Sequence, residues 1–229
     1  MRLITWNCNL SLARKLDLLL QLEPDIAVIQ ECEESLIVPD GYLFSWRGNN
    51  PKKGLGVLSK KQKVIVSPLM QDQWIYFLPL TFPETGLRLL ALWAYNHRAS
   101  RFGLDKIGYP LEILSSLSEW LSEGKAIVVG DFNNSIIWDK PKAALNFSAI
   151  DNKLRSLGFR SAYHAYTGEK LGTETRSSYF HTKSLEKTFH IDYCYVHNSL
   201  KIKSVILPDY AHWRAASDHI PVIVEVYEE

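Results

Sequence analysis

The sequence has few of the features that mark secreted or membrane-spanning proteins. Its three cysteines, Cys8, Cys32 and Cys194, are odd in number and form no Cys-x-x-Cys pair, which favours a reducing compartment. No apolar run approaches the roughly 20 residues that span a bilayer, and the N-terminal segment is too polar for the core of a signal peptide. We therefore expect a cytoplasmic protein that does not insert into a membrane.

An excess of charge of one sign is also missing. The chain has 26 Lys and Arg against 25 Asp and Glu, so its formal net charge is +1. This near-neutral total does not indicate tight, non-specific binding to a polyanion. Disorder is excluded because 46% of the residues are hydrophobic and 12% are aromatic. No Gly/Ser-rich or Pro-rich linker interrupts the 229 residues, so we expect one domain over residues 1–229, with no evident obligate protein partner.

What the chain does contain is a series of short apolar runs separated by polar turns. Two runs rich in β-branched and aromatic residues, 2–9 and 25–30, flank a helical leucine pattern over 11–22 with Ser11 as its candidate N-cap. Strands outnumber helices about two to one, which suggests two packed sheets with helices outside them. Further strands are predicted at 42–47, 54–59, 64–69, 74–81, 87–95, 126–129, 189–196, 201–207 and 220–226, and further helices near 104–124 and 145–157.

Acidic, amide and histidine side chains stand where several of these runs end. A carboxylate buried without a partner is costly, so such groups must be solvated, paired or bound to a cation. Oxygen ligands without a Cys/His cluster favour Mg²⁺ or Mn²⁺ over zinc, and Mg²⁺ commonly bridges one or two carboxylates to substrate phosphates. The pattern therefore indicates metal-assisted chemistry on a phosphate ester. The strand-end residues are Asn7, Asn9, Glu31, Asp131, Asn133, Asp192, Asp218 and His219.

Five short motifs then occur in a recognisable order. They are Thr5-Trp6-Asn7-Cys8-Asn9, Gln30-Glu31, Gly130-Asp131-Phe132-Asn133, Ile191-Asp192-Tyr193 and Ser217-Asp218-His219. Each is weakly specific alone, but together they resemble the endonuclease/exonuclease/phosphatase superfamily, to which DNase I and exonuclease III belong, from residue 4 to about residue 224. The resemblance implies an α/β fold, a four-layer α/β/β/α sandwich of two mainly antiparallel sheets flanked by helices, with the active site at one edge of the sheets.

The resemblance also implies which residues hold the metal ion. Glu31 would be the main ligand of a Mg²⁺ ion, for which Mn²⁺ is the expected substitute. Its supporting ligands would be Asn7, Asn9 and Asp218.

The other matched residues would carry the reaction, a single in-line displacement. Asp131 would deprotonate or orient the attacking water, while Asn133 would hold the scissile phosphate. Asp192 would orient His219, which would donate to a phosphate oxygen as negative charge grows in the transition state.

The substrate side departs from the pattern of the DNA-repair members of this superfamily. Where those members carry a Tyr and an Asn, the chain reads Trp93-Ala94-Tyr95-Asn96-His97. We match Asn96 to the substrate-side Asn and keep Trp93, Tyr95 and His97 open as candidates for one phosphate contact. His181 is a further candidate for contact with the substrate.

Charge is unevenly distributed near the N-terminus. Residues 23–40 contain six acidic and no basic residues, whereas residues 41–63 contain six basic and no acidic ones. One interpretation of the basic segment is a solvated hairpin. The other is a rim that grips a nucleic-acid backbone, with Lys52 and Lys53 among its members.

These observations favour a Mg²⁺-dependent nuclease that hydrolyses DNA or RNA backbones. The alternative is a phosphatase or phospholipase-type phosphodiesterase of the same superfamily, acting on a small-molecule or lipid phosphate ester. The chain lacks the Pro-x-Trp-x-Asp-Arg motif of inositol-polyphosphate phosphatases, and this absence counts against the phosphatase alternative. A catalytically silent binding module is disfavoured because the matched set of acids, amides and histidine is intact.

Overall fold

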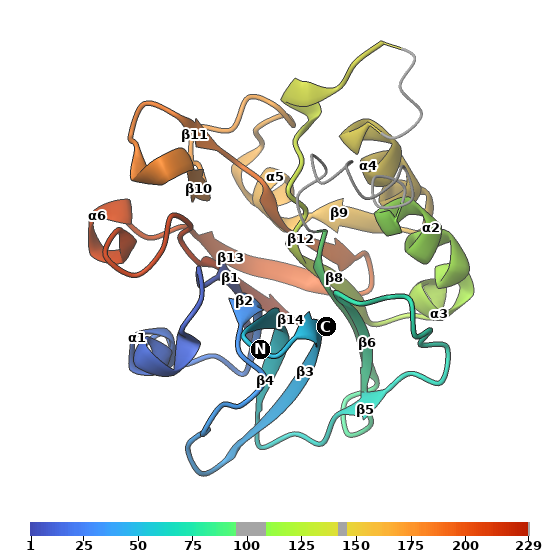
Figure 1. Cartoon of the computed structure of the whole chain (residues 1–229). Coiled ribbons are helices and arrows are strands. Elements are labelled where there is room, and N and C mark those ends of the chain that lie inside the picture. Colours follow the sequence, from blue (N-terminus) through green and yellow to red (C-terminus); the bar gives the residue numbers. More distant parts are fainter. Residues whose placement is uncertain (95–108, 142–145, 229) are drawn as a thin grey trace.

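A computed structural model describes residues 1–94, 109–141 and 146–228, and it contains two six-stranded sheets packed face to face (Figure 1). The strand orders are β13-β14-β1-β2-β4-β3 in the first sheet and β5-β6-β7-β8-β12-β9 in the second. The first sheet consists of β1 (Arg2–Asn7), β2 (Ile26–Cys32), β3 (Tyr42–Asn50), β4 (Lys53–Lys60), β13 (Lys201–Ile206) and β14 (Val222–Tyr227). The second consists of β5 (Ile65–Val66), β6 (Phe77–Phe82), β7 (Leu87–Trp93), β8 (Ala126–Asp131), β9 (Phe159–Ser161) and β12 (Asp192–His197).

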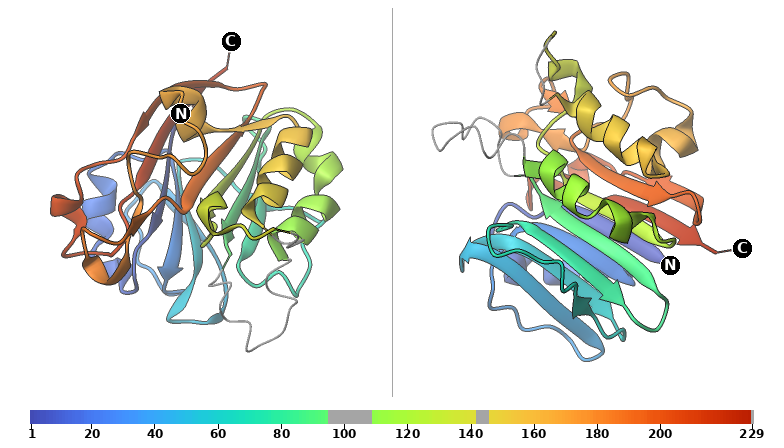
Figure 2. Two further views of the ribbon diagram at one scale, coloured as in Figure 1. Left: turned by 90° about the horizontal axis from the view of Figure 1, so that it is seen from above. Right: turned by 90° about the vertical axis from the view of Figure 1, so that its right-hand side faces the viewer.

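Helices cover the outer face of each sheet, so the predicted four-layer sandwich is confirmed (Figure 2). On the first sheet, Trp6 of β1 packs edge-on against Trp213 of α6 (Tyr210–Trp213), with ring centroids 5.0 Å apart. On the second sheet, Phe147, Ile150 and Leu154 share one buried face of α4 (Phe147–Ser156), because a spacing of three or four residues returns to the same side of a helix. The other helices are α1 (Leu16–Leu20), α2 (Tyr109–Ser116), α3 (Ser118–Ser122) and α5 (Ala162–Thr167).

Several short elements complete the fold. A two-stranded hairpin, β10 (Tyr179–Phe180) with β11 (Thr188–Phe189), precedes β12. The 3₁₀ turns are η1 (Leu12–Arg14), η4 (Ile136–Trp138) and η5 (His181–Lys183). In the described part of the chain, no helix combines the length and the apolar character needed to cross a membrane.

Strand pairing brings the predicted motif positions to one edge of the sandwich. The pairs β1–β2 and β7–β8 are parallel and the other neighbouring strands are antiparallel, which confirms two mainly antiparallel sheets. Asn7 lies opposite Gln30, and Asp131 lies between Trp93 of β7 and Asp192 of β12. The carboxyl ends of four strands and the start of β12 therefore meet at the same place.

The expected helix over 11–22 is only partly present. Asn9, Leu10 and Ser11 all have positive φ, and Ser11 makes no capping bond with its side chain, so regular helix begins only at Leu16. The predicted strand over 64–69 is reduced to Ile65–Val66 because Pro68 cannot donate to a sheet ladder.

Candidate active site

Asp131 ends β8 as a fully buried carboxylate. Gly130, just before it, has φ +152, and a Cβ there would lie 1.8 Å from the carbonyl oxygen of Leu92, so only glycine lets β8 approach β7 this closely. Oδ2 of Asp131 accepts from Nδ2 of Asn7 at 3.0 Å, and Oδ1 accepts from the backbone N–H of Asn133 at 2.8 Å. Nδ2 of Asn133 donates to Oδ2 of Asp131 at 3.1 Å. The backbone of Asn133 has φ 48, a left-handed value that Asn adopts more readily than most residues.

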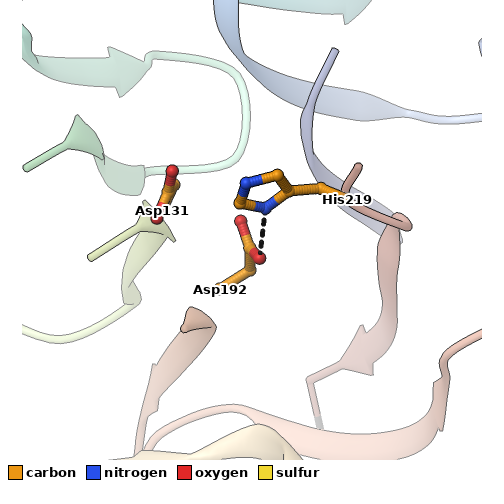
Figure 3. Close-up of side chains that lie close together, drawn as sticks. All are labelled: Asp131, Asp192 and His219. Atoms are coloured by element: carbon orange, nitrogen blue, oxygen red, sulfur yellow. Dashed lines mark hydrogen bonds and ion pairs between the residues drawn. The ribbon is translucent and has the colours of Figure 1, made fainter. Parts of the chain in front are cut away.

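His219 and Asp192 form a buried pair beside Asp131 (Figure 3). Nδ1 of His219 donates to Oδ2 of Asp192 at 2.9 Å, which leaves the second ring nitrogen on the side of Asp131. Ligand atoms of the three residues all lie within 4.8 Å of one another. Among the described residues, Oδ1 of Asp192 is a buried oxygen without a hydrogen-bond partner.

The backbone around this pair is fixed by two serines. The Ser178 hydroxyl accepts from the backbone N–H groups of Ile191 and Asp192, at 3.1 Å each. The Ser217 hydroxyl accepts from the backbone N–H of His219 at 3.0 Å and donates to the carbonyl oxygen of Asn7 at 2.7 Å. Ser217 therefore connects the histidine loop to the end of β1.

The pKa values of Asp131 and His219 are both raised, for different reasons. Burial and the nearby Asp192 charge raise the pKa of Asp131 to about 7, although His219 acts to lower it. Burial alone would lower the pKa of His219, but the charge of Asp192 and its hydrogen bond raise it to about 9. Such values near neutral pH suit a base and a protonated donor in one site.

Glu31 leaves the sheet through a β-bulge. The register of β2 against β4 shifts between Gln30 and Cys32, and Glu31 there has φ 60, a left-handed conformation that is strained for this residue type. Its Oε1 accepts from Nδ2 of Asn7 at 3.3 Å, and its Oε2 lies 3.2 Å from Nζ of Lys53. The bulge thus turns the Glu31 carboxylate towards Asn7 and Lys53.

The carboxylate oxygens of Glu31 and Asp192 are of the kind that bind a hard divalent cation. Glu31 already attracts a positive group, the Lys53 ammonium, and Asp192 retains a buried oxygen that no described group satisfies. The amide of Asn7 is turned so that its Oδ1 accepts from the backbone N–H of Asn9 at 3.0 Å, while its NH₂ group faces Asp131 and Glu31. In this state, Asn7 orients both carboxylates.

Tyr179 lies beside the Asp192–His219 pair and bonds His181, although only His181 was singled out from the sequence. The Tyr179 ring lies 4.5 Å from the His219 ring, and its hydroxyl pairs with Nδ1 of His181 at 2.8 Å. Burial and the charges of Asp218, Asp131 and Glu31 raise the pKa of Tyr179 to about 12. The contact between His181 and the substrate stays a prediction. Tyr179 was not singled out from the sequence, because it lies in a hairpin too short to show a pattern.

Of the other residues predicted to contact the substrate, the structure describes Trp93, Lys52 and Lys53. Trp93 is buried, with the Tyr76 ring 4.7 Å away and Nζ of Lys53 5.2 Å from its own ring centroid, so it faces the protein interior. Lys52 is exposed in the turn before β4. Tyr95, Asn96 and His97 lie outside the described residues.

Solved structures share this fold over the whole chain. The 3′ phosphatase NExo from Neisseria, bound to a product DNA hairpin, superposes with a TM-score of 0.74 at 21% identity and 99% coverage of both chains. An AP endonuclease from Archaeoglobus fulgidus gives 0.73 at 16% identity, with 98% of each chain covered. A humanized TDP2 from D. rerio gives 0.65 at 15% identity, with 99% of this chain and 98% of that chain covered. No curated protein sequence matches the chain.

The sequence itself matches a family model over nearly its whole length. Residues 4–219 match the Endonuclease/Exonuclease/phosphatase family, a span that contains all five motifs and every residue of the site described above. The family and the solved structures of this fold comprise phosphate-ester hydrolases. The protein is therefore a phosphate-ester hydrolase that belongs to the Endonuclease/Exonuclease/phosphatase family.

Proposed function

We propose that the protein is a Mg²⁺-dependent phosphodiesterase, and specifically a nuclease that hydrolyses DNA or RNA backbones. The observation that carries this proposal is the buried Asp192–His219 pair facing Asp131, with Glu31 joined to the same network through Asn7. These groups supply a base, a proton donor and an anionic ligand within one site. The Neisseria and Archaeoglobus proteins, described as a DNA-bound 3′ phosphatase and an AP endonuclease, support a nucleic-acid substrate.

In this reaction, Asp131 holds the attacking water and accepts its proton. Asn133 and Asn7 keep the Asp131 carboxylate in one orientation through their hydrogen bonds. Asp192 holds Nδ1–H of His219, so that the opposite ring nitrogen donates to a phosphate oxygen as charge develops there. Asn133 remains our candidate for contact with the scissile phosphate.

Glu31 would hold the metal ion, and Asn7, Asn9 and Asp218 are the proposed supporting ligands. Since Asn7 turns its NH₂ group towards Glu31, it would coordinate the ion only through Oδ1, which accepts from the backbone N–H of Asn9. A bound Mg²⁺ or Mn²⁺ would neutralise charge on the phosphate and on the leaving oxygen.

The buried and free state of all three cysteines fits our prediction of a cytoplasmic protein.

Substitution of the two reacting groups tests the mechanism. Asp131→Asn and His219→Gln should each lower kcat about 10²- to 10⁴-fold, because a base or a transition-state donor is removed. His197→Gln, on the same strand as Asp192 but paired with Ser199, is the matched control and should retain wild-type kcat. Hydrolysis is measured with Mg²⁺ on single- and double-stranded DNA and RNA, and wild-type rates for both site variants would refute the assignment.

A terminal phosphate is the second candidate substrate. The NExo structures are described both as a 3′ phosphatase and as a 3′-5′ exonuclease. A matched set of oligonucleotides with an internal phosphodiester, a 3′ hydroxyl or a 3′ phosphate separates these activities. Inositol phosphates and sphingomyelin test the small-molecule and lipid alternatives in the same assay.

A further inference from the structure

The loop between β1 and α1 has an unusual backbone. Asn9, Leu10 and Ser11 have φ values of 51, 66 and 52, so three consecutive non-glycine residues adopt the left-handed conformation. The left-handed conformation is unfavourable for non-glycine residues, and runs of it persist only where their surroundings impose them. Some contact must therefore hold this loop.

The side chain of Lys15 makes that contact. Nζ donates to the carbonyl oxygens of Cys8 at 2.5 Å, Asn9 at 3.2 Å and Leu10 at 2.8 Å. A fourth bond, at 2.6 Å, reaches the carbonyl oxygen of Ala216 in the loop that carries Asp218 and His219. The left-handed turn aims successive carbonyl groups at one point, and the ammonium occupies that point.

The other side of the loop is held by an opposite charge. Both oxygens of Glu33 accept backbone N–H groups, those of Leu12 and Ala13, at 2.8 Å each. Glu33 follows β2 two residues after Glu31, so the loop is fixed to the strand that carries the metal-ligand candidate. The carbonyl groups of the loop thus bind the Lys15 ammonium, and its backbone N–H groups bind the Glu33 carboxylate.

The loop conformation determines how Asn7 is oriented. Because Asn9 is left-handed, its backbone N–H donates to Oδ1 of Asn7, and this turns the NH₂ group of Asn7 towards Asp131 and Glu31. Ala216, the fourth acceptor of Lys15, precedes Ser217, which bonds both the Asn7 carbonyl and the His219 backbone. One ammonium thus touches both loops that deliver active-site residues.

We propose that Lys15 is a positioning residue of the active site, whose ammonium holds the Asn7–Ser11 loop against the Ala216–His219 loop and so sets the orientation of Asn7 between Asp131 and Glu31. This inference rests on the proposed function for its effect on hydrolysis, but its structural part is independent of any substrate. With four carbonyl acceptors around its three N–H bonds, the Lys15 ammonium has no donor left for a substrate phosphate.

The test compares Lys15→Met with Arg14→Met, which removes the same charge from an exposed neighbour. In Lys15→Met, amide hydrogen exchange should accelerate at least tenfold at Asn9, Leu12 and Ala13, and Mn²⁺ affinity measured by electron paramagnetic resonance should weaken about tenfold. Hydrolysis should show a kcat reduced about 10- to 100-fold with little change in KM, because the reacting groups are misplaced rather than removed. Arg14→Met should match the wild type in every measurement.

Chemical rescue distinguishes positioning from a general loss of stability. Lys15→Ala leaves the carbonyl groups in place and removes the stem, so added n-propylammonium should restore Mn²⁺ affinity and kcat in part, whereas n-propanol should not. Wild-type amide exchange and Mn²⁺ affinity in Lys15→Met would overturn the proposal, as would a lowered Tm with unchanged Mn²⁺ affinity in the folded variant. If the wild-type protein hydrolysed no phosphate ester, the proposed function would fail, while amide exchange would still decide the role of Lys15.

Discussion

At the residue scale, two buried carboxylates face each other with different tasks. Asp192 is paired with the imidazole of His219, whereas Asp131 accepts from the side-chain amides of Asn7 and Asn133 and from the backbone N–H of Asn133. Burial, and then the nearby charge of Asp192, raise the pKa of Asp131. Two aspartates in different surroundings therefore suit the two roles that we propose, orientation of His219 for Asp192 and general base for Asp131.

This arrangement predicts a bell-shaped pH dependence of kcat. Activity should rise as Asp131 loses its proton, since its pKa is raised to about 7, and fall as His219 loses its proton, since its pKa is raised to about 9. A bound cation shifts the acidic limb to lower pH because it favours the carboxylate. Replacing Asp192 by Asn removes the charge that raises the His219 pKa, so the alkaline limb should move to lower pH, as measured by a kcat–pH profile. An alkaline limb unmoved by Asp192→Asn would mean that another group titrates there.

The identity of the site residues follows from the sequence, but their orientation does not. Glu31 and Asp131 each follow an apolar run and His219 directly precedes one, and a carboxylate or imidazole at the end of a buried strand already indicates a candidate site. The inward turn of the Asn7 amide depends on the φ of Asn9 and on Lys15, a lysine that resembles any surface lysine in the sequence. Single-residue patterns carry no information on such backbone conformations.

At the scale of single elements, the contact between β7 and β8 depends on one missing Cβ. The carbonyl oxygen of Leu92 occupies the space where a side chain at Gly130 would begin. The parallel register continues past this point and sets Trp93 beside Asp131. The position of Asp131 is thus tied to the close approach of β7 and β8 at Gly130.

Gly130→Ala should therefore destabilise the protein by about 3 kcal/mol, or roughly 6–12 °C in Tm for a chain of this length, because strand separation must accommodate the methyl group. Gly86→Ala is the matched control, since Gly86 also has positive φ, at +70, but a Cβ there meets no atom within 4 Å. The destabilisation there should be near 1 kcal/mol, from backbone strain alone. Equal decreases in Tm for the two variants, measured by thermal unfolding, would argue against the close approach of the strands.

Long apolar elements of this fold were predictable, and its short polar ones were not. The β-α-β start, most strands of both sheets and the longer helices follow from periodicity. The elements α5, α6, β9, β10 and β11 have only two to six residues each, too few to show a period, and β9 was not among the predicted strands. Tertiary contacts define such elements, as where the Phe180 ring of β10 stacks on the Tyr210 ring of α6. The hairpin that carries Tyr179 was therefore absent from the predicted organisation.

At the scale of the whole molecule, the basic segment divides into two groups. Lys52 and Lys53 lie at the start of β4, where Lys53 meets Glu31, whereas Lys60 ends the same strand and Lys61 follows it. Seven residue steps of extended chain separate Lys53 from Lys60 by about 23 Å. Only the first group adjoins the active site.

If the substrate is a polynucleotide, Lys52→Gln with Lys53→Gln should weaken binding and lower the slope of log K against log salt by about 0.7–0.9 for each phosphate that the protein no longer neutralises. The pair Lys60→Gln with Lys61→Gln removes the same charge at the other end of β4 and should leave the slope unchanged. Binding is measured by fluorescence anisotropy over a salt series, without hydrolysis. Identical slopes for the two double variants would contradict a rim confined to the active-site end.

The pairing of the first and last strands has a practical consequence. The Met1 ammonium bonds the carbonyl oxygen of Val226 at 2.8 Å, and Arg2 pairs with Glu225 at 2.9 Å, while β1 runs from there towards Asn7. Five residue steps, about 17 Å of extended strand, therefore separate this end of the sheet from the catalytic edge. A tether or fusion partner attached beside Met1 or after β14 would anchor the molecule with its catalytic edge directed away from the support.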